Sequence, residues 1–163
     1  MKLLELISGS QNLKRYIKYV DDPLNPIKSD IEGSLMNENI ILSPFNQKIL
    51  TESTVLVFIS PDNGNLRVRP LGTNTYVIDI FCPLDLEYWL IKNEGLLRVF
   101  RIGDEISKLI DGKRVAGVGD VNIISYKSGN LDGTYGYLRL NLEIDSVSLM
   151  TRNWLYDFKT YIW

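Results

Sequence analysis

Hydrophobic and polar residues alternate with a period of two near the end of the chain, over residues 137–145. One set is Leu138, Leu140, Leu142 and Ile144, and the other is Tyr137, Arg139, Asn141, Glu143 and Asp145. Successive side chains of a β-strand point to opposite faces. The pattern therefore predicts a strand with one buried face and one polar face, and the open question is what the polar face does.

Other segments predict further strands. The continuous apolar run at 54–60, the alternating residues 66–70 and the alternating residues 75–82 predict a three-strand antiparallel meander, with a turn at 61–64 between the first two. Residues 115–127 predict a strand that pairs with the C-terminal strand through a polar turn at 128–133. A short strand is expected within 39–42.

Apolar residues recur at the spacing of a helix in two regions of the chain. Residues 2–20 predict a helix broken near Gly9, with Ser10 capping its second part, and the prolines of residues 21–26 end it. Residues 94–111 predict the longest helix. Its expected apolar stripe is Leu96, Val99, Phe100, Ile106, Leu109 and Ile110, and its expected polar side is Arg98, Arg101, Asp104, Glu105 and Lys108. Residues 85–93 fit either a helical turn or a bulged strand.

These elements predict the α+β class, with an antiparallel or mixed β-sheet of about five strands and one or two helices packed on one face. The length of 163 residues fits a single domain over 1–163. Residues 23–50, rich in Pro, Gly, Asn and Ser, fit either an extended arm that reaches a neighbour or an ordered surface loop. Residues 151–163 form an aromatic C-terminal tail.

The charge balance argues against a dedicated nucleic-acid binder, because 18 basic and 20 acidic residues leave a net charge of −2. We expect Lys14, Arg15 and Lys18 to form the solvated face of a helix. Cys82 is the only cysteine, so no intramolecular disulfide can form, and a small buried apolar side chain is expected there. The N-terminus does not resemble a signal peptide, and we expect a protein made in the cytoplasm or assembled from it.

The sequence contains no histidine, which removes catalytic triads and the commonest general base and transition-metal ligand. A metal site would need carboxylates, which favour Mg²⁺, Mn²⁺ or Ca²⁺. The candidates are Asp79, Asp85, Glu87, Asp120, Glu143 and Asp145. Their spacing lacks the E-x-K of a PD-(D/E)xK nuclease, so we expect them to face solvent.

The glycines at 117 and 119 lie between a helix and a strand, which is the wrong context for phosphate binding. We therefore assign no catalytic, cofactor-binding or metal-binding residue and expect a protein that is not an enzyme. The tail aromatics Trp154, Tyr156, Phe158, Tyr161 and Trp163 are expected to dock on this chain or on a neighbouring subunit.

Residues 89–145 resemble the core of bacteriophage tail terminator and tail completion proteins, which join head and tail. The resemblance rests on an order of features: an arginine-bearing helix "LLRVFRIGDEISKLIDG", a glycine-containing strand "VAGVGDVNII", and the alternating strand "GYLRLNLEID". The upstream strands "TVLVFIS" and "TYVIDIFC" and the run "WLI" fit the same plan. The resemblance covers about two thirds of the chain, outside the N-terminal helix, the 23–50 segment and the tail.

The resemblance implies a structural virion protein that forms a ring, commonly a hexamer, at the phage neck. Such a ring ends the tail tube, contacts head-completion and connector proteins, and lets DNA pass without specific binding. The implied location is the virion, after assembly in the host cytoplasm, with no cofactor and no membrane. Three alternatives remain open: another collar, head-completion or tail-associated subunit; a carboxylate-metal nuclease; and a small ligand-binding domain.

Overall fold

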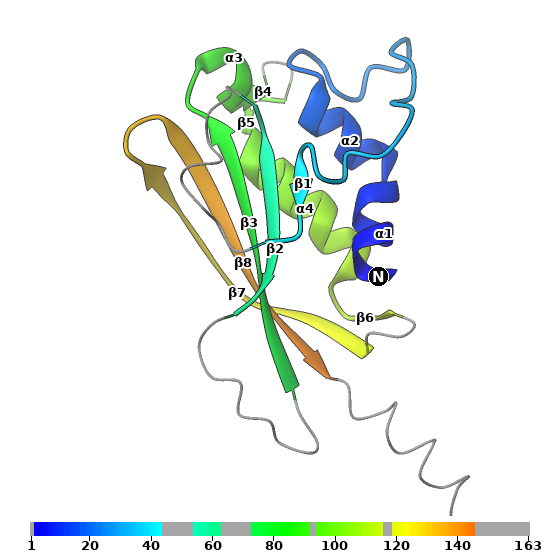
Figure 1. The fold of residues 1–163 in the computed structure, drawn as a ribbon. Helices are drawn as coiled ribbons and strands as arrows, with labels where there is room; N and C mark the ends of the chain where they lie inside the picture. Colours follow the sequence, from blue (N-terminus) through cyan, green and yellow to red (C-terminus); the bar gives the residue numbers. More distant parts are fainter. Residues whose placement is uncertain (1, 44–53, 63–72, 92–93, 116–118, 146–163) are drawn as a thin grey trace, which may run out of the picture.

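The computed structural model describes residues 2–43, 54–62, 73–91, 94–115 and 119–145. Its centre is a six-stranded mixed sheet in the order β1-β2-β3-β8-β7-β6 (Figure 1). The strands are β1 (Ile40–Ile41), β2 (Leu56–Pro61), β3 (Thr73–Pro83), β6 (Lys113–Val115), β7 (Gly119–Leu131) and β8 (Tyr135–Asp145). β1 runs parallel to β2, and every other neighbouring pair in this sheet is antiparallel. The predicted α+β class with a mixed sheet is confirmed, with six strands in place of about five.

Three helices lie together on one side of the sheet: α1 (Lys2–Gly9), α2 (Gln11–Lys18) and α4 (Arg98–Ile110) (Figure 1). A short helix α3 (Leu86–Trp89) leads into a small two-stranded sheet of β4 (Leu90–Ile91) and β5 (Leu96–Leu97). Residues 85–91 thus form a helical turn followed by a short strand. None of the described helices has the length and apolar character that crossing a membrane requires.

The main core lies between these helices and one face of the sheet. It includes Ile7 of α1, Leu13 of α2, Ile102 and Ile106 of α4, and Leu142 of β8, all fully buried. The predicted alternation of β8 is confirmed, because all four of its predicted core residues are buried. In β3, Ile78, Ile80 and Cys82 face this core, but the residues between them are buried on the other face. Burial of the core-facing apolar face is the main force that fixes the helices on the sheet.

The break predicted in the N-terminal helix is also confirmed. α1 ends at Gly9, and the hydroxyl of Ser10 accepts a hydrogen bond of 3.3 Å from the backbone N–H of Leu13. This N-cap satisfies one of the backbone donors that the first turn of α2 would otherwise leave unpaired. The cap lets the chain turn between two short helices that both face the core.

The predicted three-strand meander is wrong. β2 pairs directly with β3, from Leu56 opposite Phe81 to Pro61 opposite Tyr76, and β2 has β1 on its other side. No strand can therefore lie between β2 and β3. Residues 66–70, which were predicted to be the middle strand, lie outside the described residues.

Within the 23–50 segment, the described part packs on its own chain. Ile40 of β1 is fully buried, and the buried Asn39 donates a hydrogen bond of 2.9 Å from its side-chain amide to the backbone carbonyl of Val55. The predicted short strand is confirmed as β1. The described residues fit the surface-loop alternative, and residues 44–50 lie outside them, as does the aromatic tail.

Candidate functional site

The outer face of the sheet, which is the face turned away from the helices, carries an ordered grid of side chains. Strand register places Phe58 of β2, Asp79 of β3, Arg139 of β8 and Lys127 of β7 in one row. The next row holds Leu56, Phe81, Tyr137 and Gly129 in the same strand order. Side chains directly opposite on antiparallel strands are close enough to interact, so each row acts as a unit.

Asp79 and Arg139 form a bidentate ion pair at the centre of this face. Arg139 donates from Nε to Oδ1 of Asp79 at 2.6 Å and from Nη2 to Oδ2 at 2.8 Å. Asp79 is only 2% exposed, whereas Arg139 is half-buried. The hydrogen bond to Asp79 raises the pKa of Arg139. Both carboxylate oxygens of Asp79 are used, so its charge is neutralised within the protein.

A hollow of about 220 Å³ lies beside this ion pair. Its lining residues come from three strands and are Asp79, Phe81, Lys127, Leu131, Tyr137 and Arg139. The ring of Tyr137 lies over Gly129: a Cβ added at Gly129 would lie 2.8 Å from Cε1 of Tyr137. Glycine at this position therefore lets the tyrosine ring lie against β7. The hollow combines an aromatic wall with two cationic groups.

The outer edge of β7 is the second notable feature of the site. β6 pairs with Gly119–Val121 only, and residues 122–131 pair with no further strand among the described residues. Ile124 is 54% exposed and Tyr126 is 70% exposed. The register shifts between Ile123 and Ser125, so Ile124 is the extra residue of a β-bulge. Unpaired strand edges present backbone donors and acceptors that can pair with another chain.

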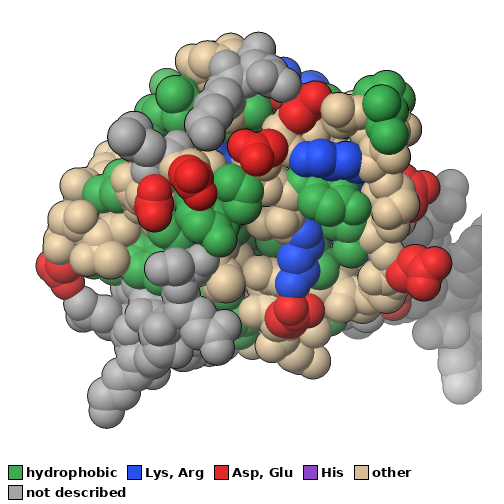
Figure 2. Space-filling model, turned by 90° about the horizontal axis from the view of Figure 1, so that it is seen from above, with side chains coloured by type: hydrophobic (Ala, Val, Ile, Leu, Met, Phe, Trp, Pro, Cys, Tyr) green, Lys and Arg blue, Asp and Glu red, His purple; other side chains and the backbone are tan. Residues whose placement is uncertain are grey.

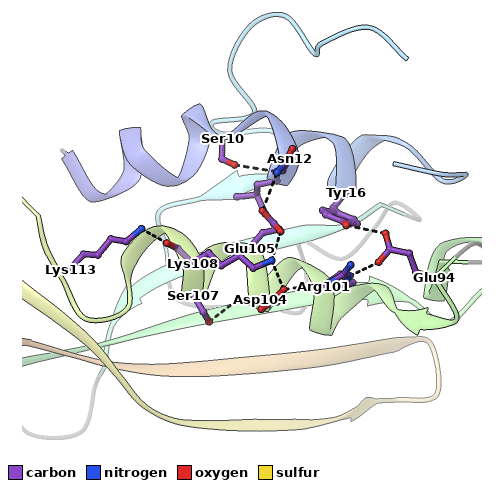
Figure 3. Close-up of polar contacts among 12 residues, drawn as sticks. Ser10, Asn12, Tyr16, Glu94, Arg101, Asp104, Glu105, Ser107, Lys108 and Lys113 are labelled. Atoms are coloured by element: carbon purple, nitrogen blue, oxygen red, sulfur yellow. Dashed lines mark hydrogen bonds and ion pairs between the residues drawn. The ribbon is translucent and has the colours of Figure 1, made fainter. Parts of the chain in front are cut away.

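A second polar group joins α2 to α4 on the helix side (Figure 3). Tyr16 donates to Glu94 at 3.0 Å, and Glu94 also forms an ion pair with Arg101. Burial, with the Glu94 hydrogen bond, raises the pKa of Tyr16 to about 12. Further along α4, Lys108 contacts Asp104 at 2.7 Å. The contacts of Glu94 with Tyr16 and Arg101 therefore link α2 to α4, whereas Lys108 and Asp104 pair within α4.

Arg98 overturns one prediction. It was expected on the polar side of the helix, yet it is 1% exposed, and burial lowers its pKa. Its guanidinium donates to four backbone carbonyls: Nη1 to Tyr16 at 2.7 Å and to Tyr19 at 2.8 Å, Nε to Tyr88, and Nη2 to Val20. Three of these carbonyls lie at or just after the end of α2, where the helix dipole is negative. Arg98 lies four residues before Ile102, a spacing that could have placed it on the buried stripe.

Of the basic trio of α2, only Lys18 lies on a solvated face as predicted. Lys14 is buried and donates from Nζ to the carbonyl of Gly33 at 2.6 Å. Arg15 donates to the carbonyl of Lys28 at 2.8 Å and pairs with Asp30, and Lys18 pairs with Glu38. The prediction was wrong for Lys14 and Arg15 because residues 28–38 fold back over α2. The three cations fix that segment in place.

The six predicted carboxylates do not converge on a metal site. Asp79 was expected to face solvent but is buried and held by Arg139, whereas Asp85 and Glu87 lie at α3 and are exposed as expected. Asp120 and Glu143 lie on β7 and β8, and the side chain of Asp145 is outside the description. Within the described ranges, no group of three or more metal-ligating side chains occurs.

Cys82 is fully buried in the main core, as predicted. Burial raises the pKa of its thiol to about 12. The thiol is 3.2 Å from the carbonyl oxygen of Tyr88 and donates to it. Gly119 begins β7 with a φ of +125°, a conformation that favours glycine and fits the predicted role at the strand start. Gly117 lies outside the described residues.

A family model described as YomW matches residues 10–144. The matched span runs from the start of α2 almost to the end of β8, so it includes the hollow and the β7 edge. The chain belongs to the YomW family. This family is phage-derived, of the SPBeta-like prophage kind, and membership points to a phage protein. No curated protein matches the chain.

Proposed function

We propose that this YomW-family protein is a structural component of the phage particle. In this proposal it forms a ring of identical copies at the neck, which ends the tail tube and joins the tail to the head. It assembles in the host cytoplasm, performs no reaction and needs no cofactor. Its partners are its own copies, the tail tube and head-completion or connector proteins. DNA passes through the ring without specific binding.

The observation that carries the proposal is the β7 edge. Residues 122–131 offer a long row of backbone hydrogen-bonding groups beside the exposed side chains of Ile124 and Tyr126. Natural proteins usually shield such an edge, because it promotes pairing with other chains. A long exposed edge with apolar side chains is therefore suited to contact between subunits.

A ring also needs a second, different patch, because head-to-tail contacts join two unlike surfaces. The opposite edge of the sheet ends in β1, which pairs with Val57 and Phe58 of β2. The two edges differ in length and face opposite directions across the sheet (Figure 1). A contact between β7 of one copy and the β1 side of the next would repeat around a closed ring.

The surface charge supports association with like copies. The net charge is −2, and low net charge favours self-association. Seen from above, hydrophobic side chains lie in several patches with acidic and basic side chains between them (Figure 2). No large field of one sign on this view would repel a second copy.

A genetic experiment tests the function. The gene is interrupted in an inducible prophage, and the lysate is examined by electron microscopy after induction. We expect DNA-filled heads and separate tails, with infectivity restored by the wild-type gene in trans. A normal yield of joined, infectious particles would refute the proposal.

A pair of variants links the function to the β7 edge. Ile124→Lys combined with Tyr126→Lys should fail to restore infectivity, because both charges lie at the proposed contact. Ile27→Lys is the matched control, since Ile27 is 91% exposed in the loop that follows α2. Equal complementation by both variants would show that the edge is not used. Cryo-electron microscopy of the particle then separates a tail terminator from another collar subunit.

A further inference from the structure

The row of Asp79, Arg139 and Lys127 holds one carboxylate and two cations, and Asp79 pairs with only one of these cations, Arg139. Lys127 lies directly opposite Arg139 on the outer face, and like charges in that position repel each other. The carboxylate of Asp79 is already used by two hydrogen bonds from Arg139. Within the described part of the chain, Nζ of Lys127 has no acceptor and no ion-pair partner. The Asp62 carboxylate also lies near enough to Arg139 to raise the pKa of that guanidinium. The exposed Lys127 is therefore the cation of this row that an incoming carboxylate could pair with.

The neighbouring row offers space beside these charges. Gly129 has no side chain, so the ring of Tyr137 extends from β8 and lies over β7. Phe81 packs against this ring with centroids 6.0 Å apart, and Phe58 packs edge-to-face on Phe81 at 5.8 Å. The aromatic stack fixes the wall of the hollow. An apolar side chain that enters from the β7 edge would meet the ring of Tyr137.

Both features lie beside residues 122–131 of β7, whose outer edge pairs with no strand in the described part of the chain. A strand that added to this edge would place one residue opposite Lys127 and, two positions away, another opposite Gly129. Side chains at alternate positions of a strand point to the same face, so both would lie on the outer face. In this mode of recognition, backbone pairing supplies affinity and the pockets for alternate side chains supply specificity.

We propose that the hollow and the β7 edge together bind an extended segment of a partner protein that carries an acidic residue two positions from a large apolar residue. The carboxylate pairs with Lys127. The apolar side chain lies beside Gly129, against the exposed side of the Tyr137 ring. This inference rests on the proposed function only in treating the β7 edge as an assembly surface, and the segment it describes would compete with the neighbouring copy for that edge.

The test uses a blocked peptide, Thr-Thr-Glu-Thr-Phe-Thr-Thr, and its Gln analogue in place of Glu. Each peptide is titrated into the isotope-labelled full chain, and the backbone amide signals are followed by NMR. We expect the Glu peptide to shift the amides of residues 122–131. We expect the Gln peptide to bind about fivefold more weakly, the effect of one cross-strand charge pair.

Variants of the protein isolate the charge. Lys127→Gln should weaken the Glu peptide about fivefold and leave the Gln peptide unchanged. The matched control is Lys113→Gln, because Lys113 is an exposed lysine on β6 at the same side of the sheet. Gly129→Ala should weaken both peptides, since its methyl group displaces the Tyr137 ring. Equal affinity of the two peptides, or amide shifts confined to other strands, would overturn the inference.

The two proposals can fail separately. If the chain is monomeric and binds the Glu peptide with the expected charge dependence, the proposed binding site is supported and the proposed ring is refuted. If the chain forms rings through another surface and does not bind the peptide, the proposed ring is supported and the proposed binding site is refuted. If the rings use β7, the Glu peptide should compete with the neighbouring copy and lower the particle mass. A mass that is unchanged at saturating peptide would count against the site.

Discussion

Replacing Arg98 with methionine should destabilise the protein strongly, although no ionic partner is removed. The side chain of Arg98 is buried beneath the end of α2, and its guanidinium binds four carbonyls, three from the end of α2 and one from α3. Methionine has a similar length and can fill much of the same space, but it donates no hydrogen bond. The carbonyls at the end of α2 would lose the group that satisfies them.

The magnitude follows from two opposing contributions. A hydrogen bond to a charged group contributes about 1.5–3 kcal/mol, which gives about 6–12 kcal/mol for four bonds. Removing the buried cation recovers its desolvation cost, which is several kcal/mol and which lowers the pKa of Arg98 in the folded protein. Only the contact with Tyr16 is fully buried, so water can replace part of the other three. We expect a net loss of about 3 kcal/mol.

Urea unfolding followed by tryptophan fluorescence measures this loss. The Arg98→Lys variant should lose less stability than Arg98→Met but more than none, because an ammonium group has three donors for the four carbonyl acceptors. Arg101→Met is the matched control on the same helix, and its partly exposed ion pairs should contribute less than about 1 kcal/mol. A loss below about 1 kcal/mol for Arg98→Met, with an unchanged slope in urea, would refute the reasoning.

Three further changes test other contacts. Burial raises the pKa of the Cys82 thiol from 9.0 to about 12, so above pH 9 the unfolded chain loses this proton while the folded protein keeps it. The free energy of unfolding should therefore fall by about 1.4 kcal/mol for each pH unit above 9. Denaturant titrations at a series of pH values measure this fall. Gly136→Ala should destabilise by about 2 kcal/mol in thermal unfolding, because a Cβ there would lie 1.9 Å from the ring of Trp89. Asp79→Asn should cost about 2 kcal/mol in urea unfolding, because it leaves Arg139 without its buried partner.

Each of these changes has a matched control. Cys82→Ala should remove the thiol-dependent part of the alkaline loss, and an unchanged pH dependence would contradict its origin in that thiol. Gly9→Ala should be nearly neutral, because nothing lies within 4 Å of the added Cβ. Glu143→Gln changes a partly exposed carboxylate on the same outer face as Asp79. If it costs as much as Asp79→Asn, the buried ion pair is not the cause.

The sequence pattern predicted an element correctly where the structure of that element depends only on neighbouring residues. The alternation from Leu138 to Ile144 predicted β8 and its buried face, and the sequence at Ser10 predicted the break between α1 and α2. Both signals are local, because burial of one strand face and capping of one helix turn need no distant partner. The class of fold followed from the order of such elements.

The misses all depend on distant partners. The buried cations Arg98 and Lys14 are satisfied mainly by backbone carbonyls far away in the chain, which no spacing rule identifies. The direct pairing of β2 with β3 was missed because alternation at 66–70 predicts a strand but does not specify its neighbours. The hollow could not be predicted because it depends on Asp79 and Lys127 lying on either side of Arg139. Only the register of the three strands places them there.

The particle mass of the purified full chain tests the central claim most directly. Light scattering coupled to size exclusion is measured from about 1 µM to about 200 µM, because assembly depends on concentration. The account predicts a closed multiple of the 18.7 kDa subunit at the upper end, and its loss when Ile124 and Tyr126 are both replaced by lysine. A mass of one subunit across the whole range, or assembly that survives both substitutions, would contradict it.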